Sequence, residues 1–117
     1  MILNRMRRLC NRGERCRSDI LRKVVALGTP EPESVVEQLV SEGYIDDARY
    51  ARAFARDKSS LQGWGKVKIR VDLQRKGIEE SAITAALSEI DSEAAEKKLQ
   101  KLALAKLRQL RNESDTN

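Results

Sequence analysis

An internal repeat constrains the fold of this 117-residue chain more than any other feature of its sequence. Residues 21–39 align with residues 69–87 without a gap, at an offset of 48 positions. Apolar residues coincide at positions such as Leu21 and Ile69, and Arg22 aligns with Arg70, whereas most other polar residues differ between the two segments. This pattern is expected when two copies of one structural unit keep the same buried core while their surfaces diverge. The sequence therefore predicts tandem structural units.

The composition indicates that these units are helical. Apolar residues make up 40% of the chain, aromatic residues 3% and charged residues 35%, with only two prolines. This balance is typical of a surface-rich helical protein and not of a β-sandwich or barrel. We predict an all-α, elongated fold of tandem three-helix repeats. Residues 1–45 form the first repeat, residues 46–91 the second, and residues 92–117 the first helix of a truncated third repeat with a polar tail.

Capping residues divide the first repeat into three helices. A basic helix is expected at about residues 2–11. The second begins near Ser18, whose side chain suits an N-cap, and ends before Gly28. The third begins at residues 29–31, where a proline costs no backbone donor, and ends at Gly43.

The second repeat begins with an acidic cap. Asp46 or Asp47 is expected to cap a helix over residues 47–59, and residues 59–65 are expected to form a loop. The third helix of this repeat is predicted over residues 79–89.

Residues 66–76 allow two interpretations. The run KVKIRVDL alternates apolar and polar residues, which is typical of a strand. However, a lone strand leaves its backbone hydrogen bonds unpaired, and no other segment offers a partner strand. The repeat also aligns this segment with a predicted helix. We therefore favour a helix.

A last helix is predicted from Ser92, which is placed to cap it. Its apolar residues recur at helical spacing and form one long stripe. The stripe consists of Ala95, Leu99, Leu102, Ala103, Leu107 and Leu110. The two helices that would cover this stripe in a complete repeat are absent from the sequence, so we expect a truncated protein. An exposed stripe of this kind favours self-association.

The sign of the charge alternates along the chain. Residues 48–76 hold nine Lys or Arg against two Asp or Glu, whereas residues 26–47 and 77–96 each hold six acids and no base. Because the acids are segregated, the basic field is not cancelled locally, and it favours a phosphate backbone or an acidic protein groove as partner. For any single residue, the alternative is a solvated helix face. The candidate partner- or DNA-binding residues are Arg49, Arg52, Arg56, Lys66, Lys68, Arg70, Arg75 and Lys76.

Trp64, between Gly63 and Gly65, is a candidate interface aromatic. It could stack on a nucleic-acid base or anchor a protein interface. The alternative is that Trp64 fills the junction between two units. Tyr44, which follows Gly43, is expected to have such a packing role one unit earlier.

The sequence offers no set of residues for catalysis, a metal or a cofactor. It contains no histidine, and Cys10 and Cys16 are too few for a structural zinc site, so both are expected as reduced thiols. The adjacent Asp46 and Asp47 lack a third ligand and are expected to be helix caps. No apolar run is long enough for a membrane span or a signal peptide, so we expect a cytoplasmic protein with no membrane partner.

Three motifs, in this order and spacing, resemble the RecX family of recombination regulators. They are GYIDDARY at residues 43–50, GWG followed by KVKIRVDL at residues 63–73, and KGI at residues 76–78. The resemblance covers roughly residues 16–110. One departure is Cys16, near the start of a helix that begins with serine in many relatives. The resemblance implies an all-helical fold of tandem three-helix repeats, with a helix at residues 66–76.

The resemblance also implies a function. Members of this family are non-enzymatic modulators that bind the RecA–DNA filament, inhibit the recombinase and ATPase activities of RecA, and bind DNA to varying degrees. The expected partner is therefore the RecA filament, with DNA as a second partner. A stand-alone basic nucleic-acid-binding helical module is the alternative. The candidate cations inside the matching segments are Arg49, Lys66, Lys68, Arg70, Arg75 and Lys76.

Overall fold

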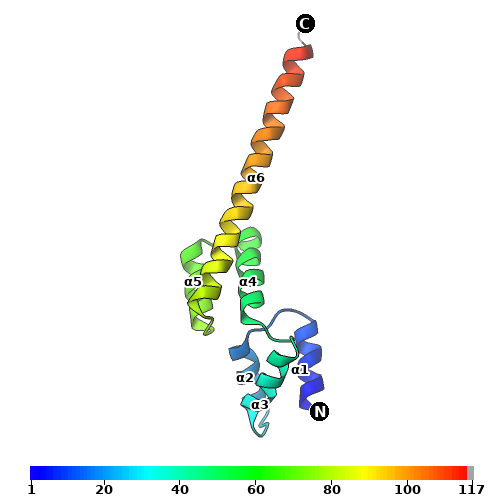
Figure 1. Ribbon diagram of the computed structural model, residues 1–117, viewed down its shortest axis with the longest axis vertical. Helices are drawn as coiled ribbons and strands as arrows, with labels where there is room; N and C mark the ends of the chain where they lie inside the picture. The colour runs from blue at the N-terminus through cyan, green and yellow to red at the C-terminus, as the bar shows by residue number, and fades with distance from the viewer. Residues whose placement is uncertain (116–117) are drawn as a thin grey trace.

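The computed structural model describes the backbone of residues 1–115 and the side chains of residues 1–110. Over this range the protein is all-helical and elongated, with principal extents of 78 × 27 × 22 Å (Figure 1). The helices are α1 (Ile2–Asn11), α2 (Arg17–Ala26), α3 (Pro32–Ser41), α4 (Asp47–Gln62), α5 (Lys66–Arg75) and α6 (Glu80–Asp115). The predicted all-α class is confirmed. None of the described helices is long and apolar enough to cross a membrane.

The first unit consists of α1, α2 and α3, and α3 packs against both of the other helices (Figure 1). Gly28 and Gly43, with φ of 71° and 83°, follow α2 and α3, as the sequence predicts. Tyr44 packs against the core of this unit, which confirms its predicted packing role. The buried core side chains are Met6, Ile20, Val24, Val36, Leu39 and Ile45.

The predicted starts of α2 and α3 lie close to the observed ones, but the predicted roles of Ser18 as a cap and of the proline in 29–31 as the first-turn proline are wrong. Helix α2 begins at Arg17, so Ser18 lies inside its first turn, and the Ser18 hydroxyl donates to the backbone oxygen of Lys76 at 2.7 Å. Helix α3 begins at Pro32 instead of residues 29–31, after Glu31 in a left-handed conformation. Pro32 occupies the first turn, where the missing N–H has no helical partner to lose.

The second unit consists of α4, α5 and the first turns of α6. Asp46 caps α4 by accepting a hydrogen bond from the backbone N–H of Arg49 at 3.1 Å. The helix continues to Gln62, so the predicted loop over residues 59–65 is wrong, and the connection to α5 is only residues 63–65. The serines do not interrupt the helix because the Ser60 hydroxyl bonds the carbonyl of Arg56, one turn earlier, at 2.8 Å.

Residues 66–75 form a helix, which confirms the favoured interpretation of this segment. Ile69 and Leu73 are fully buried, whereas Val67 is 78% exposed and Val71 is 38% exposed. The two buried residues are four positions apart and lie on one face of α5. The alternating pattern in the sequence therefore came from two apolar residues on the core side and two near solvent.

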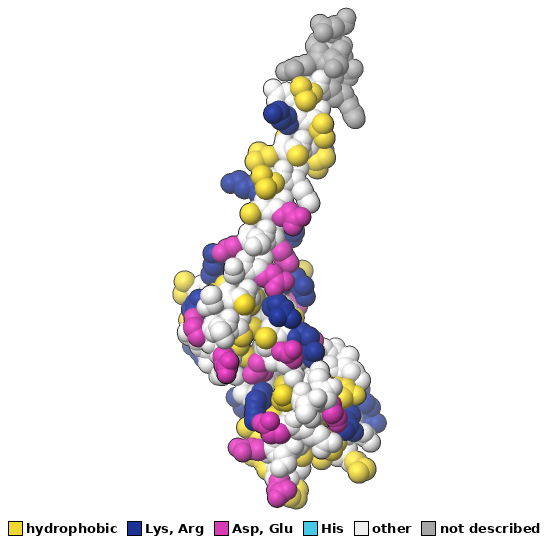
Figure 2. All heavy atoms as spheres, viewed as in Figure 1, with side chains coloured by type: hydrophobic (Ala, Val, Ile, Leu, Met, Phe, Trp, Pro, Cys, Tyr) yellow, Lys and Arg dark blue, Asp and Glu magenta, His cyan; other side chains and the backbone are white. Residues whose placement is uncertain are grey.

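Helix α6 is continuous from Glu80 to Asp115, so the predicted new helix at Ser92 is wrong. Residues 88–96 contain no glycine or proline, and alanine and glutamate within this stretch favour continuation of the helix. Beyond the second unit α6 projects as an isolated rod (Figure 1), with hydrophobic side chains along it (Figure 2). Its exposed leucines include Leu99, Leu102 and Leu107 of the predicted stripe. The assignment of residues 1–45, 46–91 and 92–117 to three repeats stays a prediction.

The start of α2 joins the two units. Cys16 is fully buried in the core of the second unit, among side chains of α4, α5 and α6. The backbone N–H of Arg17 donates to Asp47 Oδ1 at 2.7 Å, and the Lys76 ammonium donates to Asp19 Oδ2 at 2.9 Å. The units are therefore packed on each other and not connected by a flexible linker. The other buried side chains of the second core are Ala51, Ala55, Ile69, Leu73, Ile78, Ile83, Ala86 and Leu87.

Candidate functional site

The eight predicted binding cations have different surroundings in the structure. Six of them form ion pairs within the chain, and Arg56 and Lys68 form none with the side chains that the structure describes. A cation whose hydrogen-bond donors already face a carboxylate has less to offer a partner. The eight therefore divide into structural cations and available cations.

Arg49 is a structural cation. Its Nε donates to Glu14 Oε1 at 2.7 Å, and its Nη2 donates to the carbonyl oxygens of Gly43 at 3.0 Å and Tyr44 at 3.3 Å. The hydrogen bond that Arg49 donates to Glu14 is the main reason that the pKa of Arg49 is raised. Arg49 thus ties the segment between α1 and α2 to the segment between α3 and α4.

Lys76 is also structural. Besides its bond to Asp19, its ammonium lies 5.8 Å from the centre of the Tyr50 ring. The hydrogen bond to Asp19 is the largest effect on the pKa of Lys76 and raises it, against the smaller effect of burial. Burial has the largest single effect on the pKa of Asp19 and would raise it, but the hydrogen bonds from Lys76 and Cys16, together with the positive charges of Lys76 and Arg22, lower that pKa. Both side chains hold the two units together.

Lys66 and Arg70 tie α5 to α6. The Lys66 ammonium donates to Asp91 Oδ2 at 2.5 Å, and Arg70 pairs with Glu80. Each of these four side chains is at least one third exposed, so the pairs are accessible to solvent and contribute little to stability.

The available cations lie on α4 and α5. Arg52 Nε is 3.9 Å from Glu89, a distance too long for a hydrogen bond, and the exposed Arg56 lies one turn further along the same face of α4. On α5 the side chain of Arg75 is 77% exposed. Its Nη1 lies 3.8 Å from Asp72 Oδ1 of the same helix, and this distance is also too long for a hydrogen bond. We call Arg52, Arg56, Lys68 and Arg75 the second-unit cationic surface.

Trp64 packs on its own unit and not at the junction between units. Its ring meets the edge of Phe54, with centroids 6.2 Å apart and planes at 75°. The ammonium groups of Lys58 and Lys68 lie 4.7 Å and 4.1 Å from the ring centre. This cation–π arrangement fixes Lys68 beside the indole. Lys58 was not among the predicted site residues; its spacing of four residues from Phe54 is the sequence feature that links it to this cluster.

Neither thiol is suited to chemistry. Cys10 and Cys16 are free, as expected, and burial is the main reason that the pKa of each is raised. A raised pKa keeps a thiol protonated and weakly nucleophilic at neutral pH. Among the side chains described, no three His, Cys, Asp or Glu gather closely enough to hold a metal ion.

The fold and the cationic surface define a class: an elongated helical protein of three-helix units with exposed cations on its helix faces. The family profile described as RecX, second three-helix domain, matches residues 46–87. A crystal structure of a regulatory protein RecX superposes with a TM-score of 0.72 and 34% sequence identity, covering 95% of this chain and 56% of that one. The chain belongs to the RecX family.

Curated relatives agree with this assignment. A regulatory protein RecX of Mycobacterium sp. (strain KMS) is 30% identical over 103 residues, which are 86% of this chain and 56% of that protein. A regulatory protein RecX of Xanthomonas oryzae pv. oryzae (strain MAFF 311018) is 38% identical over 80 residues, which are 66% of this chain and 49% of that protein. The chain therefore spans about half the length of the curated relatives that it matches.

Proposed function

We propose that this chain is a non-enzymatic regulator that binds the RecA–DNA filament in the cytoplasm and inhibits the recombinase and ATPase activities of RecA. The relatives carry the name regulatory protein RecX, and this name is the first support. The observation that carries the proposal is the second-unit cationic surface, where none of the carboxylates that the structure describes lies within hydrogen-bond distance of Arg52, Arg56, Lys68 or Arg75.

The shape of the molecule suits an extended partner. A rod-like body of 78 × 27 × 22 Å can contact several subunits of a filament at once. Because the joint between the first two units is packed, both units would dock as one body, and the second contact costs little additional conformational entropy. Exposed cations along such a body provide electrostatic steering towards an anionic groove.

The test is the DNA-dependent ATP hydrolysis of RecA during titration with this chain. A variant with Arg56, Lys68 and Arg75 changed to Gln removes three available cations. The control changes Lys97, Lys98 and Lys101, which are exposed on α6, to Gln and removes the same charge. If each exposed contact contributes about 0.2–1 kcal/mol, the first variant needs roughly 3- to 160-fold more protein for half inhibition.

The control should inhibit nearly as well as the unmodified chain. Equal losses in both variants would mean that net charge and not this surface matters, and absence of inhibition by the unmodified chain would remove the proposal. The alternative, a stand-alone basic nucleic-acid-binding module, predicts tight binding to naked single-stranded DNA and no preference for RecA-coated DNA. A competition between these two DNA forms separates the proposals.

We also propose that α6 contributes to self-association. Leu99, Leu102 and Leu107 are more than half exposed, and contiguous apolar surface of this kind favours contact with another chain. Sedimentation velocity over a range of concentrations tests this proposal. A sedimentation coefficient that does not change with concentration would contradict it.

A further inference from the structure

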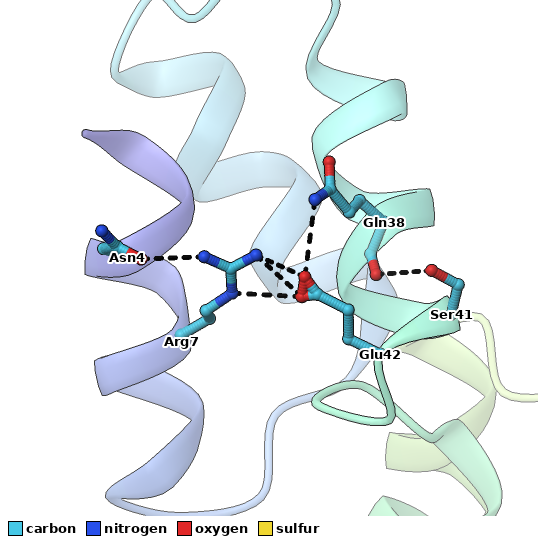
Figure 3. Close-up of polar contacts among 5 residues, drawn as sticks. All are labelled: Asn4, Arg7, Gln38, Ser41 and Glu42. Carbon is cyan, nitrogen blue, oxygen red and sulfur yellow. Dashed lines mark hydrogen bonds and ion pairs between the residues drawn. The ribbon is translucent and has the colours of Figure 1, made fainter.

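Helix α1 has two basic faces, and only one is neutralised. On the face towards α3, Arg7 donates from Nε and Nη2 to the carboxylate of Glu42, with Nε 3.1 Å from Oε2, and from Nη1 to Asn4 Oδ1 at 2.8 Å (Figure 3). The hydrogen bond from Arg7 is the main reason that the pKa of Glu42 is lowered. The charge of Arg7 is therefore used within the fold.

The other face of α1 and its C-cap carry three arginines at a spacing of three and four residues. Arg5, Arg8 and Arg12 are all exposed, and together with Lys23 of α2 they line a groove of about 410 Å³ with Met6 and Leu9. None of these four cations forms an ion pair with the side chains that the structure describes. We call this the α1–α2 groove.

Four acids of the first unit form ion pairs, and none of their partners is a cation of the α1–α2 groove. Glu42 pairs with Arg7, Glu14 with Arg49, Glu37 with Arg17, and Asp19 with Lys76. No acidic side chain lines the α1–α2 groove. An adjoining hollow, also lined by Arg5 and Arg8, contains no acid either. The cations of the groove are therefore not neutralised by any acid that lines it.

The residues of the groove select a ligand by their chemistry. Guanidinium groups pair with phosphate oxygens through two parallel hydrogen bonds. At a rise of about 1.5 Å per residue, Arg5 and Arg12 are about 10 Å apart along the axis of α1, so the three arginines can contact neighbouring phosphates of one strand. No aromatic side chain lines the groove, so it offers no platform for stacking an unpaired base.

We propose that the α1–α2 groove binds the phosphodiester backbone of duplex DNA through Arg5, Arg8, Arg12 and Lys23, without reading the base sequence. This site lies in the first unit and does not involve the second-unit cationic surface. It requires no RecA, so its test is independent of the proposed regulatory function.

The test is the affinity of the full chain for a short fluorescent duplex, measured by anisotropy at salt concentrations from about 50 to 200 mM. One variant changes Arg5, Arg8 and Arg12 to Gln, and the matched control changes Lys97, Lys98 and Lys101 to Gln. Circular dichroism confirms that each variant keeps its helices. An arginine that contacts phosphate contributes about 0.9 to the slope of log K against log salt, so the groove variant should lower the slope by about 2.7.

The groove variant should also bind at least about tenfold more weakly than the unmodified chain at the lower salt concentration, with the control close to the unmodified chain. An unchanged slope in the groove variant would overturn the proposal. So would equal losses in the groove variant and the control, because net charge would then explain the binding. If single-stranded DNA competes better than duplex, the assignment to duplex is wrong.

Discussion

The position of Ile69 in α5 allows a direct test of the helical fold of this segment. In a strand, Val67 and Ile69 would point to the same side and would be equally buried. In the structure Ile69 is fully buried and Val67 is 78% exposed. Changing each residue separately to Ala therefore distinguishes the two conformations.

The structure gives the expected magnitude. The Ile69→Ala change removes three buried carbon atoms, which at about 0.8 kcal/mol each amounts to about 2.4 kcal/mol. The cavity that remains adds to this loss, so the free energy of unfolding should fall by about 3 kcal/mol. The Val67→Ala change removes exposed carbons and introduces a better helix former, so its effect should stay within about 0.5 kcal/mol.

Urea denaturation followed by circular dichroism at 222 nm measures both changes. With a denaturant slope of about 2 kcal/mol per molar, the unfolding midpoint of the Ile69→Ala variant should fall by about 1.5 M, and that of Val67→Ala should hardly move. Similar losses in the two variants would refute the reasoning, because they would place both side chains in one core face.

Three further predictions concern stability. Changing Gly77, which has φ of 74° and open space around its Cα, to Ala should cost about 1–2 kcal/mol of unfolding free energy through backbone strain alone, as urea titration would measure. The folded-state pKa of Asp19 is lowered, so its bond to Lys76 stabilises the protein above about pH 4 and this stabilisation is lost at lower pH. Between neutral pH and about pH 3, the Asp19→Asn variant should therefore lose less unfolding free energy than the unmodified protein does. Because Leu102 is 59% exposed, Leu102→Gln should change the melting temperature little, whereas Ile83→Ala, in the core, should lower it by several degrees.

Local patterns in the sequence predicted most of the helices but not the contacts between distant residues. The Asp46 cap and the stops at Gly28 and Gly43 depend on neighbours a few positions away, and such features can be found in the sequence. Ser92 had the features of a cap, yet the helix continues through it, since a cap residue acts only where the preceding chain leaves the helical conformation.

The candidate site was harder to predict because ion pairs connect distant residues. Arg49 meets Glu14, 35 positions earlier, and Lys76 meets Asp19, 57 positions earlier. Segregated acids along the sequence suggested an uncancelled basic field, but folding returns several of these acids to the predicted cations. The spacing of Arg5, Arg8 and Arg12 is visible in the sequence, and only the structure shows that no acid lines their groove.

The burial of Cys16 shows that the segment that folds together is longer than the segment that repeats in the sequence. The repeated segment in the sequence suggests modules that could be cut apart, and the matching family profile spans only residues 46–87. Yet the second core is closed by a side chain that precedes this span by 30 positions. In a fragment of the second repeat alone, the buried side chains that contact Cys16 would be exposed to water. Although the sequence suggests separable repeats, the two units are expected to unfold together in one transition.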